Sequence, residues 1–266
     1  MKTIIIASDF SEEAKNATEY AIKMAKVIDA KIVLFNLHIL SVHAVNSRLP
    51  YDAILATVEK SKQKIENQVK TLSETHNITI IPYFAMGDFH EQLQRAIAEY
   101  KADFVIMGMH EKTLEGDLLG STTTEAIHKL ITPILAIPVH AKFNGINKIL
   151  YACDFNKGVT SEILEKVKTT TQKFNAELKV FHVNDNLPQT TDTAEILEPL
   201  EGVSYYYKSV QSDAVIEEIK KELISFKPDI LIMVPYEYGF WSSLIHKSKT
   251  RVMSSGLDMP LLSIHG

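Results

Sequence analysis

The sequence is short of several features that would each mark a class of protein. Its 266 residues include one cysteine, Cys153, and carry a net charge of −5. One cysteine excludes a framework of disulfides within the chain. No apolar run approaches the roughly 18 residues that cross a bilayer, and no polybasic run offers a surface to DNA or anionic lipid. The first apolar run stops at Asp9, too early for a signal peptide. We therefore expect a cytoplasmic globular protein that binds small molecules or proteins, with no nucleic acid or membrane partner.

What the sequence does have is a regular alternation of short β-branched runs with longer helical patterns. In the first half the runs are Thr3–Ala7, Lys31–Leu37, Ile78–Phe84, Phe104–Gly108 and Ile134–Val139. Strands separated by helices need crossover connections and form a parallel sheet. Several runs are apolar at consecutive positions, which is typical of strands covered by helices on both faces. The pattern predicts a doubly wound, Rossmann-like α/β fold.

The second half repeats the strand ends of the first half in the same order. The run IIASDF (5–10) returns as LYACDF (150–155), LHI (37–39) as FHV (181–183), DFVIM (103–107) as DILIM (229–233), and PILAI (133–137) as PLLSI (260–264). Four matches in one order indicate a tandem repeat. Polar residues interrupt the apolar pattern between Ala141 and Asn147, so we predict two domains, 1–143 and 144–266.

The predicted domains differ after their second strand. The first has a long helical pattern from Tyr51 to His76, with Ile54, Val58, Ile65 and Val69 at helical spacing. The second has a polar, proline-containing stretch, Asp185–Gly202, before the next strand pattern at Val203–Val210. Its second helix is expected to be short or missing.

The most informative stretch runs from Ile106 to Ile127. An apolar strand leads into a loop with glycines, and four hydroxyl residues, Ser121–Thr124, follow Gly120. The first turn of a helix has unpaired N–H groups and a partial positive charge, so such a start is a ready site for phosphate. A nucleotide in an open α/β sheet lies beyond the carboxyl ends of the strands, where Asp9, Ile39 and Gly108 stand.

These residues resemble the universal stress protein family in its tandem form, over essentially the whole chain. The resemblance rests on Ala7-Ser8-Asp9 after the first strand and His38-Ile39 after the second. ATP-binding members carry G-x-x-G, nine further residues and G-[ST]. Gly108 and Gly120-Ser121 match this motif, Glu111 replaces its second glycine, and the spacing is one residue shorter. The fold implied is that of the adenine nucleotide α hydrolase group.

The resemblance implies that the first domain binds ATP and uses its occupancy as a stress signal rather than for turnover. It assigns the adenine to Asp9 and Ile39, the ribose to Ala7 and Gly108, and the phosphates to Gly120, Ser121, Thr122 and Thr123. Ser8, Met107 and His110 complete the predicted nucleotide-binding set. Glu111 places a carboxylate close to phosphate, so binding is expected to be weak, to need a divalent cation such as Mg²⁺, or to favour another ligand.

The second domain lacks the family's ATP loop. A shift of 126 positions aligns the loops, and Gly108 then becomes Val234 and Gly120 becomes His246. We expect this domain to act as a partner of the first or to hold a site for another ligand. Family members dimerise through their fifth strands, so Ile134–Val139 and Pro260–Ile264 are predicted to pair within the chain as a pseudo-dimer. A further homodimer stays open.

Simpler structural roles compete with the predicted site. Asp9 could only cap the following helix, since Glu12 stands at capping-box spacing, and Ser121–Thr124 could be an ordinary helix start. Cys153 is interpreted as a small buried residue rather than a nucleophile. The alternative function is a nucleotide-independent interaction protein, with an interface at Phe240 and Trp241. An enzyme ranks last, because the chain lacks the H-x-G-H and S-G-G-x-D motifs of related transferases and pyrophosphatases.

Overall fold

The computed structural model describes residues 2–39, 51–109, 121–155, 159–184, 193–235 and 259–265. The elements of the first half are β1 (Lys2–Ala7), α1 (Glu12–Ile28), β2 (Ala30–His38), α3 (Tyr51–His76), β3 (Ile80–Met86), α4 (Phe89–Tyr100), β4 (Phe104–Met109), α5 (Ser121–Lys129) and β5 (Ile134–Pro138). Those of the second half are β6 (Lys148–Cys153), α6 (Ser161–Phe174), β7 (Glu177–Asn184), α7 (Thr193–Leu197), a 3₁₀ turn (Glu198–Leu200), β8 (Tyr205–Gln211), α8 (Val215–Phe226), β9 (Ile230–Met233) and β10 (Leu261–Ser263). Within these ranges no helix is both long and apolar enough to cross a membrane.

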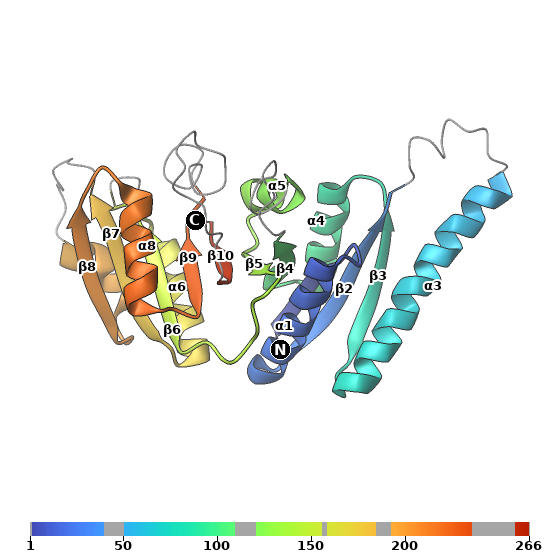
Figure 1. Ribbon diagram of the computed structural model, residues 1–266, viewed down its shortest axis with the longest axis horizontal. Helices are drawn as coiled ribbons and strands as arrows, with labels where there is room; N and C mark the ends of the chain where they lie inside the picture. Colours follow the sequence, from blue (N-terminus) through green and yellow to red (C-terminus); the bar gives the residue numbers. More distant parts are fainter. Residues whose placement is uncertain are drawn as a thin grey trace.

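The strands form one sheet in the order β3-β2-β1-β4-β5-β10-β9-β6-β7-β8. Figure 1 shows the strands placed side by side in a row that follows the long axis of the molecule, with β3 near one end and β8 at the other. Each strand pairs with its neighbours in parallel, except β5 and β10, which run antiparallel with Leu262 opposite Leu135. The predicted doubly wound α/β fold and the pairing of the two fifth strands are confirmed.

Helices cover both faces of the sheet. The core on one face contains side chains from α1, α3 and α6, and the core on the other contains side chains from α4, α5 and α8. Ile4, Ile5 and Ile6 of β1 are all fully buried, because successive side chains point into opposite cores. This explains why strands of this sheet read as continuous apolar runs rather than as alternating patterns.

The observed elements follow the predicted ones closely. Helix α3 has both predicted ends, and Ile65 and Val69 on its apolar stripe are buried. Strand β3 begins and ends two residues later than predicted. In the second half, the five-residue α7 and its 3₁₀ turn stand where the first half has the 26-residue α3. The prediction of a reduced second helix is confirmed for the described residues.

Two equivalent aspartates hold the amino ends of the central strands. The Asp103 carboxylate accepts a hydrogen bond from the Thr3 N–H at 2.9 Å, and the Asp229 carboxylate accepts one from the Lys148 N–H at 2.9 Å. Lys2 adds an ion pair to Asp103 at 2.8 Å. The matched DFVIM and DILIM runs therefore begin with a residue that satisfies an otherwise open backbone donor.

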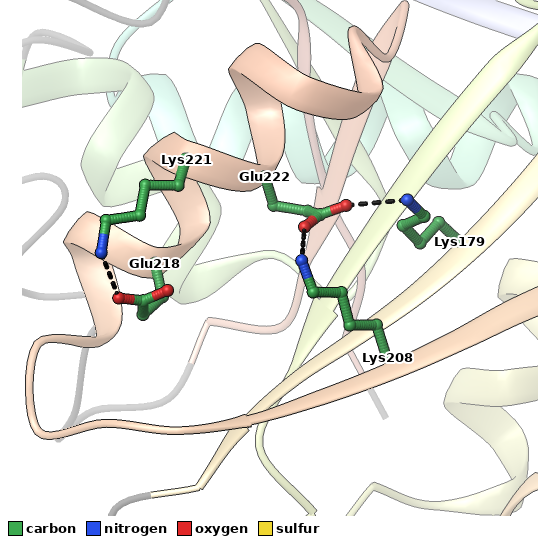
Figure 2. Close-up of polar contacts among 5 residues, drawn as sticks. All are labelled: Lys179, Lys208, Glu218, Lys221 and Glu222. Atoms are coloured by element: carbon green, nitrogen blue, oxygen red, sulfur yellow. Dashed lines mark hydrogen bonds and ion pairs between the residues drawn. The ribbon is translucent and has the colours of Figure 1, made fainter.

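A buried carboxylate fastens α8 to the sheet in the second half. Glu222 is 2% exposed, and its two oxygens lie 2.8 Å from the Lys179 ammonium of β7 and 2.5 Å from the Lys208 ammonium of β8 (Figure 2). Burial raises the pKa of the Glu222 carboxyl, but the hydrogen bonds and charges of the two lysines outweigh burial and leave this pKa below its usual value. The charged form of Glu222 is thus favoured by folding.

We expect Glu222→Gln to lower the free energy of unfolding by about 1–2 kcal/mol at pH 7, because the amide cannot hold both ammonium groups. A lowered pKa in the folded state stabilises the protein fully above the ordinary carboxyl value of 4.5, and this stabilisation is lost as the pH falls through the lowered value. The difference between variant and parent should therefore shrink in urea denaturation below pH 4.5. Glu218→Gln is the matched control, since Glu218 pairs with the exposed Lys221 on the same helix (Figure 2) and should cost under about 0.5 kcal/mol. An equal loss in both variants at every pH would contradict the interpretation.

Candidate functional site

The described part of the predicted site lies where β1 and β4 end side by side. Ile6 of β1 is opposite Ile106 of β4, so the same register puts Ser8 level with Gly108. The chain leaves β1 through α1 on one face and leaves β4 towards α5 on the other. Neighbouring strands whose connections diverge in this way form the crevice in which open α/β sheets bind ligands. The fold thus places a topological switch point at this edge, which is where the sequence predicted the site.

Side chains at this edge differ in their access to solvent. Ala7, Ser8 and Met107 are buried, with exposed fractions of 8%, 5% and 5%, whereas Asp9 is exposed. Ile39, one residue beyond β2, is 74% exposed. Asp9 and Ile39, the two residues assigned to the adenine, are therefore more accessible to solvent than Ala7, Ser8 and Met107.

The turn after β1 holds Asp9 by hydrogen bonds to its own backbone. The Asp9 carboxylate accepts from the Ser11 N–H at 3.0 Å, and the Ser8 hydroxyl accepts from the Phe10 N–H at 3.3 Å. Ser11, not Asp9, caps α1, because the Ser11 hydroxyl accepts from the Ala14 N–H at 3.2 Å. The interpretation of Asp9 as the helix cap is wrong: Asp9 lies two residues before the cap, and its carboxylate accepts from the N–H of the cap residue Ser11, within the turn.

Phe10 has a backbone conformation that bulky residues avoid. Its φ is +68°, and the other described non-glycine residues with positive φ stand at or just past the carboxyl ends of helices. A left-handed conformation costs about 1–2 kcal/mol. The Phe10 ring packs against the core, and the Lys64 ammonium lies 3.9 Å from its centroid. Strain held in place by such contacts is a feature of functional turns.

Gly108 allows α1 to lie close to β4. A Cβ atom on Gly108 would lie 2.7 Å from the Glu13 carbonyl carbon and 2.8 Å from the Glu13 oxygen. The first turn of α1 therefore occupies the space that a side chain at position 108 would need. The resemblance assigned Gly108 to the ribose. The close packing against α1 explains, without any ligand, why this position requires a glycine.

The start of α5 is attached to the same strand end. The Thr123 hydroxyl lies 3.4 Å from the Gly108 carbonyl oxygen, to which it donates, and the Thr123 side chain is 4% exposed. Thr122 is exposed at the helix start. The Thr123 side chain therefore serves to join α5 to β4, and Thr122 has the accessible hydroxyl. His110, Gly120 and the side chain of Ser121 lie outside the described residues, as do Glu111, Phe240 and Trp241.

Helix α5 also contacts α4 and the second half. His90 of α4 lies 3.0 Å from Glu125, and the hydrogen bonds of Lys129 and His90 hold the pKa of the Glu125 carboxyl below its usual value. The ring of His265, beyond β10, approaches the Ile127 carbonyl oxygen with its Nε2 at 2.5 Å. Lys166 of α6 donates to the His265 carbonyl oxygen at 2.6 Å. The helix at the predicted phosphate position is thus fixed from both halves of the chain.

The equivalent strand end in the second half carries a cluster of aromatic rings and a buried aspartate. The Phe155 ring stacks on His182 with centroids 4.7 Å apart and on Tyr207 with centroids 6.0 Å apart. His182 is fully buried, and its Nδ1 lies 3.2 Å from the Cys153 carbonyl oxygen. Burial raises the pKa of the Cys153 thiol well above its usual value, which supports its interpretation as an unreactive buried residue. These rings correspond to Phe10, His38 and Phe84 of the first half, where the His38 and Phe84 centroids are 6.1 Å apart. The two strand ends differ instead at the aspartate, since Asp154 is 7% exposed whereas Asp9 is exposed.

One supporting residue was missed from the sequence. Asn36 of β2 is 5% exposed, and its amide donates to the Ser8 carbonyl oxygen at 2.8 Å. This bond fixes the backbone of Ser8, next to Asp9. The signal was a single amide within the apolar run of β2, since a buried amide in a central strand must find a polar partner.

The comparisons with known proteins agree with this architecture. A sequence model described as the universal stress protein family matches residues 1–138. A universal stress protein of Methanocaldococcus jannaschii is 28% identical over 155 residues, which cover 51% of this chain and 94% of that protein. Universal stress protein A of Yersinia pestis is 27% identical over 146 residues, covering 54% of this chain and 96% of that protein.

The fold of the whole chain has a counterpart among solved structures. The crystal structure of a universal stress protein from Archaeoglobus fulgidus matches with a TM-score of 0.75 and 19% identity, covering 99% of this chain and 98% of that one. The likeness in fold therefore extends across both halves, beyond the 138 residues that the family model matches. Since that model covers more than half of the sequence, the chain belongs to the universal stress protein family.

Proposed function

We propose that this protein binds an adenine nucleotide, ATP, at the carboxyl ends of β1, β2 and β4, and that occupancy of this site is its signal in the stress response. Asp9 and Ile39 contact the adenine, and Ala7 and Gly108 lie beside the ribose. The phosphates bind at the start of α5, through Gly120, Ser121, Thr122 and Thr123, with Mg²⁺ between them and the carboxylates of the preceding loop.

The observation that carries the proposal is the meeting of the strained Asp9 turn with the start of α5. Ser8 is level with Gly108, and Gly108 is joined to Thr123 of α5. An acceptor for a base and a helix N-terminus for phosphates therefore stand across one strand pair. The exposed Asp9 and Thr122 are the accessible polar groups of the predicted set within the described residues.

The proposal includes a division of labour between two domains, 1–143 and 144–266, in a cytoplasmic protein. The second domain partners the first, because Asp154, at the position of Asp9, is 7% exposed and so is less accessible to a ligand than the exposed Asp9. Binding alone is enough for a signal: a ligand at a hundredfold excess over its dissociation constant stabilises the bound state by about 2.7 kcal/mol. We therefore propose a binding protein rather than an enzyme.

Calorimetric titration of ATP into the nucleotide-free protein, with and without Mg²⁺, tests the proposal. We expect one site per chain, and a loss of about tenfold or more in affinity for Asp9→Ala and Ser121→Ala, because each removes a polar contact to the ligand. Asp9→Asn keeps an oxygen for the Ser11 N–H and separates the role of the charge from that of the turn.

Asp154→Ala is the matched control, since Asp154 holds the position of Asp9 in the second half. It should leave the affinity unchanged in a folded protein. The absence of binding by the intact protein would overturn the proposal and favour the nucleotide-independent interaction protein. Binding that is lost in Asp154→Ala and retained in Asp9→Ala would also contradict the proposal, because the site would then lie in the second half.

A further inference from the structure

The two edge strands of the ten-stranded sheet, β3 and β8, differ in how far other parts of the chain cover them. At one edge β3 contains Pro82, which has no N–H to offer, and side chains from α3 and α4 pack onto the cores beside it. At the other edge β8 is largely bare: Tyr206 is 59% exposed, Tyr207 is 36% exposed, and Lys208 is exposed beside them. The five-residue α7 replaces the long helix that accompanies β3. Among the described residues of the second half, no long helix accompanies this edge strand as α3 accompanies β3.

An uncovered edge strand can pair with another extended chain, and a lysine on the edge normally discourages this. Here Lys208 is held by a carboxylate on the α8 side of the sheet, although Glu222 is shared and the charge of Lys208 is only partly compensated. Its ammonium lies 2.5 Å from Glu222, which also binds Lys179 (Figure 2). The other exposed side chains of the strand are Tyr206, Tyr207, Ser209 and Gln211. The two tyrosines suit an interface because they combine a large apolar ring with a polar tip.

We propose that β8 is the surface through which two copies of this chain associate, by antiparallel pairing of β8 with β8 about a twofold axis at Tyr207. With a twofold axis perpendicular to the sheet, side chains on one face of a copy stay on that face in the other copy. Opposite residues must then have side chains on the same face, so one residue of β8 lies opposite its own counterpart at the axis. Centred on Tyr207, the pairing sets the two Tyr207 rings together and sets Tyr206 of each copy across from Lys208 of the other. Centred on Lys208, it would oppose two like charges.

A second copy fits this edge better than an unrelated strand for two reasons. The chain already joins its equivalent strands β5 and β10 edge to edge and antiparallel at the middle of the sheet. The opposite edge is interrupted by Pro82, so association through β8 closes at two copies and does not continue into a fibre. The interface is isologous, with the same strand on both sides.

Sedimentation equilibrium of the full chain tests this interface. We expect a dimer, and an increase of about tenfold in its dissociation constant for Tyr206→Lys, which sets two lysines opposite each other twice in the symmetric pair. Ile131→Lys is the control: Ile131 is 74% exposed in the first half, and the same change there should leave association unaltered.

A disulfide reports the register directly. Opposite residues in an antiparallel pair have Cα atoms about 4.5–5.5 Å apart, within reach of a disulfide. Mild oxidation should cross-link Tyr207→Cys chains and leave Tyr205→Cys chains uncoupled, because Tyr205 would face Ser209. The native Cys153 is 6% exposed and does not compete. A monomer at all concentrations would overturn the proposal. So would a dimer that survives Tyr206→Lys unchanged and gives no disulfide in folded Tyr207→Cys chains.

Discussion

Gly108→Ala is expected to lower the free energy of unfolding by about 3 kcal/mol, at the upper end of the usual cost of overpacking. The added Cβ would meet three atoms of Glu13 at 2.7–2.9 Å, two of which belong to the backbone. A flexible side chain could move aside, but a helix backbone moves only with the whole first turn of α1. The methyl group therefore forces either a shift of α1 away from β4 or a distortion of the strand.

The same change should also weaken nucleotide binding, through α1 rather than through a lost contact. Glu13 lies in the first turn of α1, and Ser11, the cap of that helix, is held by the Asp9 carboxylate. A displaced first turn carries the Asp9 turn with it. A fall in affinity in Gly108→Ala would thus show that the turn has moved, and would not by itself show that Gly108 touches the ribose.

Urea denaturation of Gly108→Ala and Gly202→Ala separates the two reasons for a glycine. Gly202 has a φ of +87° and open space around the position of a Cβ, so alanine there costs only the left-handed conformation, about 1 kcal/mol. Gly108 lacks a positive φ, so its cost comes from the clash with Glu13. Equal and small losses in the two variants would show that α1 yields easily and would contradict the packing argument.

Local patterns predicted much of this fold because its strands are buried on both faces. The runs around Ile4–Ile6 and Phe104–Ile106 needed only their own apolarity to be recognised, and the order of the repeated anchors indicated the β5–β10 pairing. Helix α3 was predicted to the residue, since its apolar stripe runs along most of its length.

The support of the site was harder to predict because it depends on distant partners. Asn36 binds a carbonyl 28 residues away, and the space beside Gly108 is filled by Glu13, 95 positions earlier in the chain. From the sequence alone, Glu222 is indistinguishable from the other charged residues of an amphipathic helix. Only the fold places the lysines of β7 and β8 beside it. A polar residue on a buried helix face signals that a partner exists, and the fold alone identifies the partner.

Asn16→Leu is expected to lower the free energy of unfolding by about 2–3 kcal/mol. The Asn16 amide of α1 is buried and donates to the Pro138 carbonyl oxygen at 2.9 Å and to the Ala141 carbonyl oxygen at 3.0 Å. Its own oxygen accepts from the Lys142 ammonium at 2.8 Å. Leucine has a similar size but leaves these groups without their partner, and an unsatisfied buried polar group costs about 1–3 kcal/mol.

The location of these bonds gives the substitution an effect beyond stability. Pro138 ends β5, and Ala141 and Lys142 begin the connection to β6. Ala141, Phe143 and Ile146 of this connection are buried against the core, so the segment predicted to be the domain boundary is packed rather than loose. Asn16 thus fixes the path of the chain from the β5–β10 junction into the second half.

Denaturation and limited proteolysis together test this role. Asn16→Leu should be cleaved by trypsin after Lys142 faster than the parent chain, because opening of the connection exposes this bond. Lys142→Met removes only the third bond and should cost less than about 1 kcal/mol. Asn67→Leu makes the same replacement on the exposed face of α3 and should be neutral or stabilising by a few tenths of a kcal/mol, since leucine is the better helix former. If Asn16→Leu matched Asn67→Leu in stability and kept the parent's resistance to trypsin, the connection would be held by its buried apolar side chains alone.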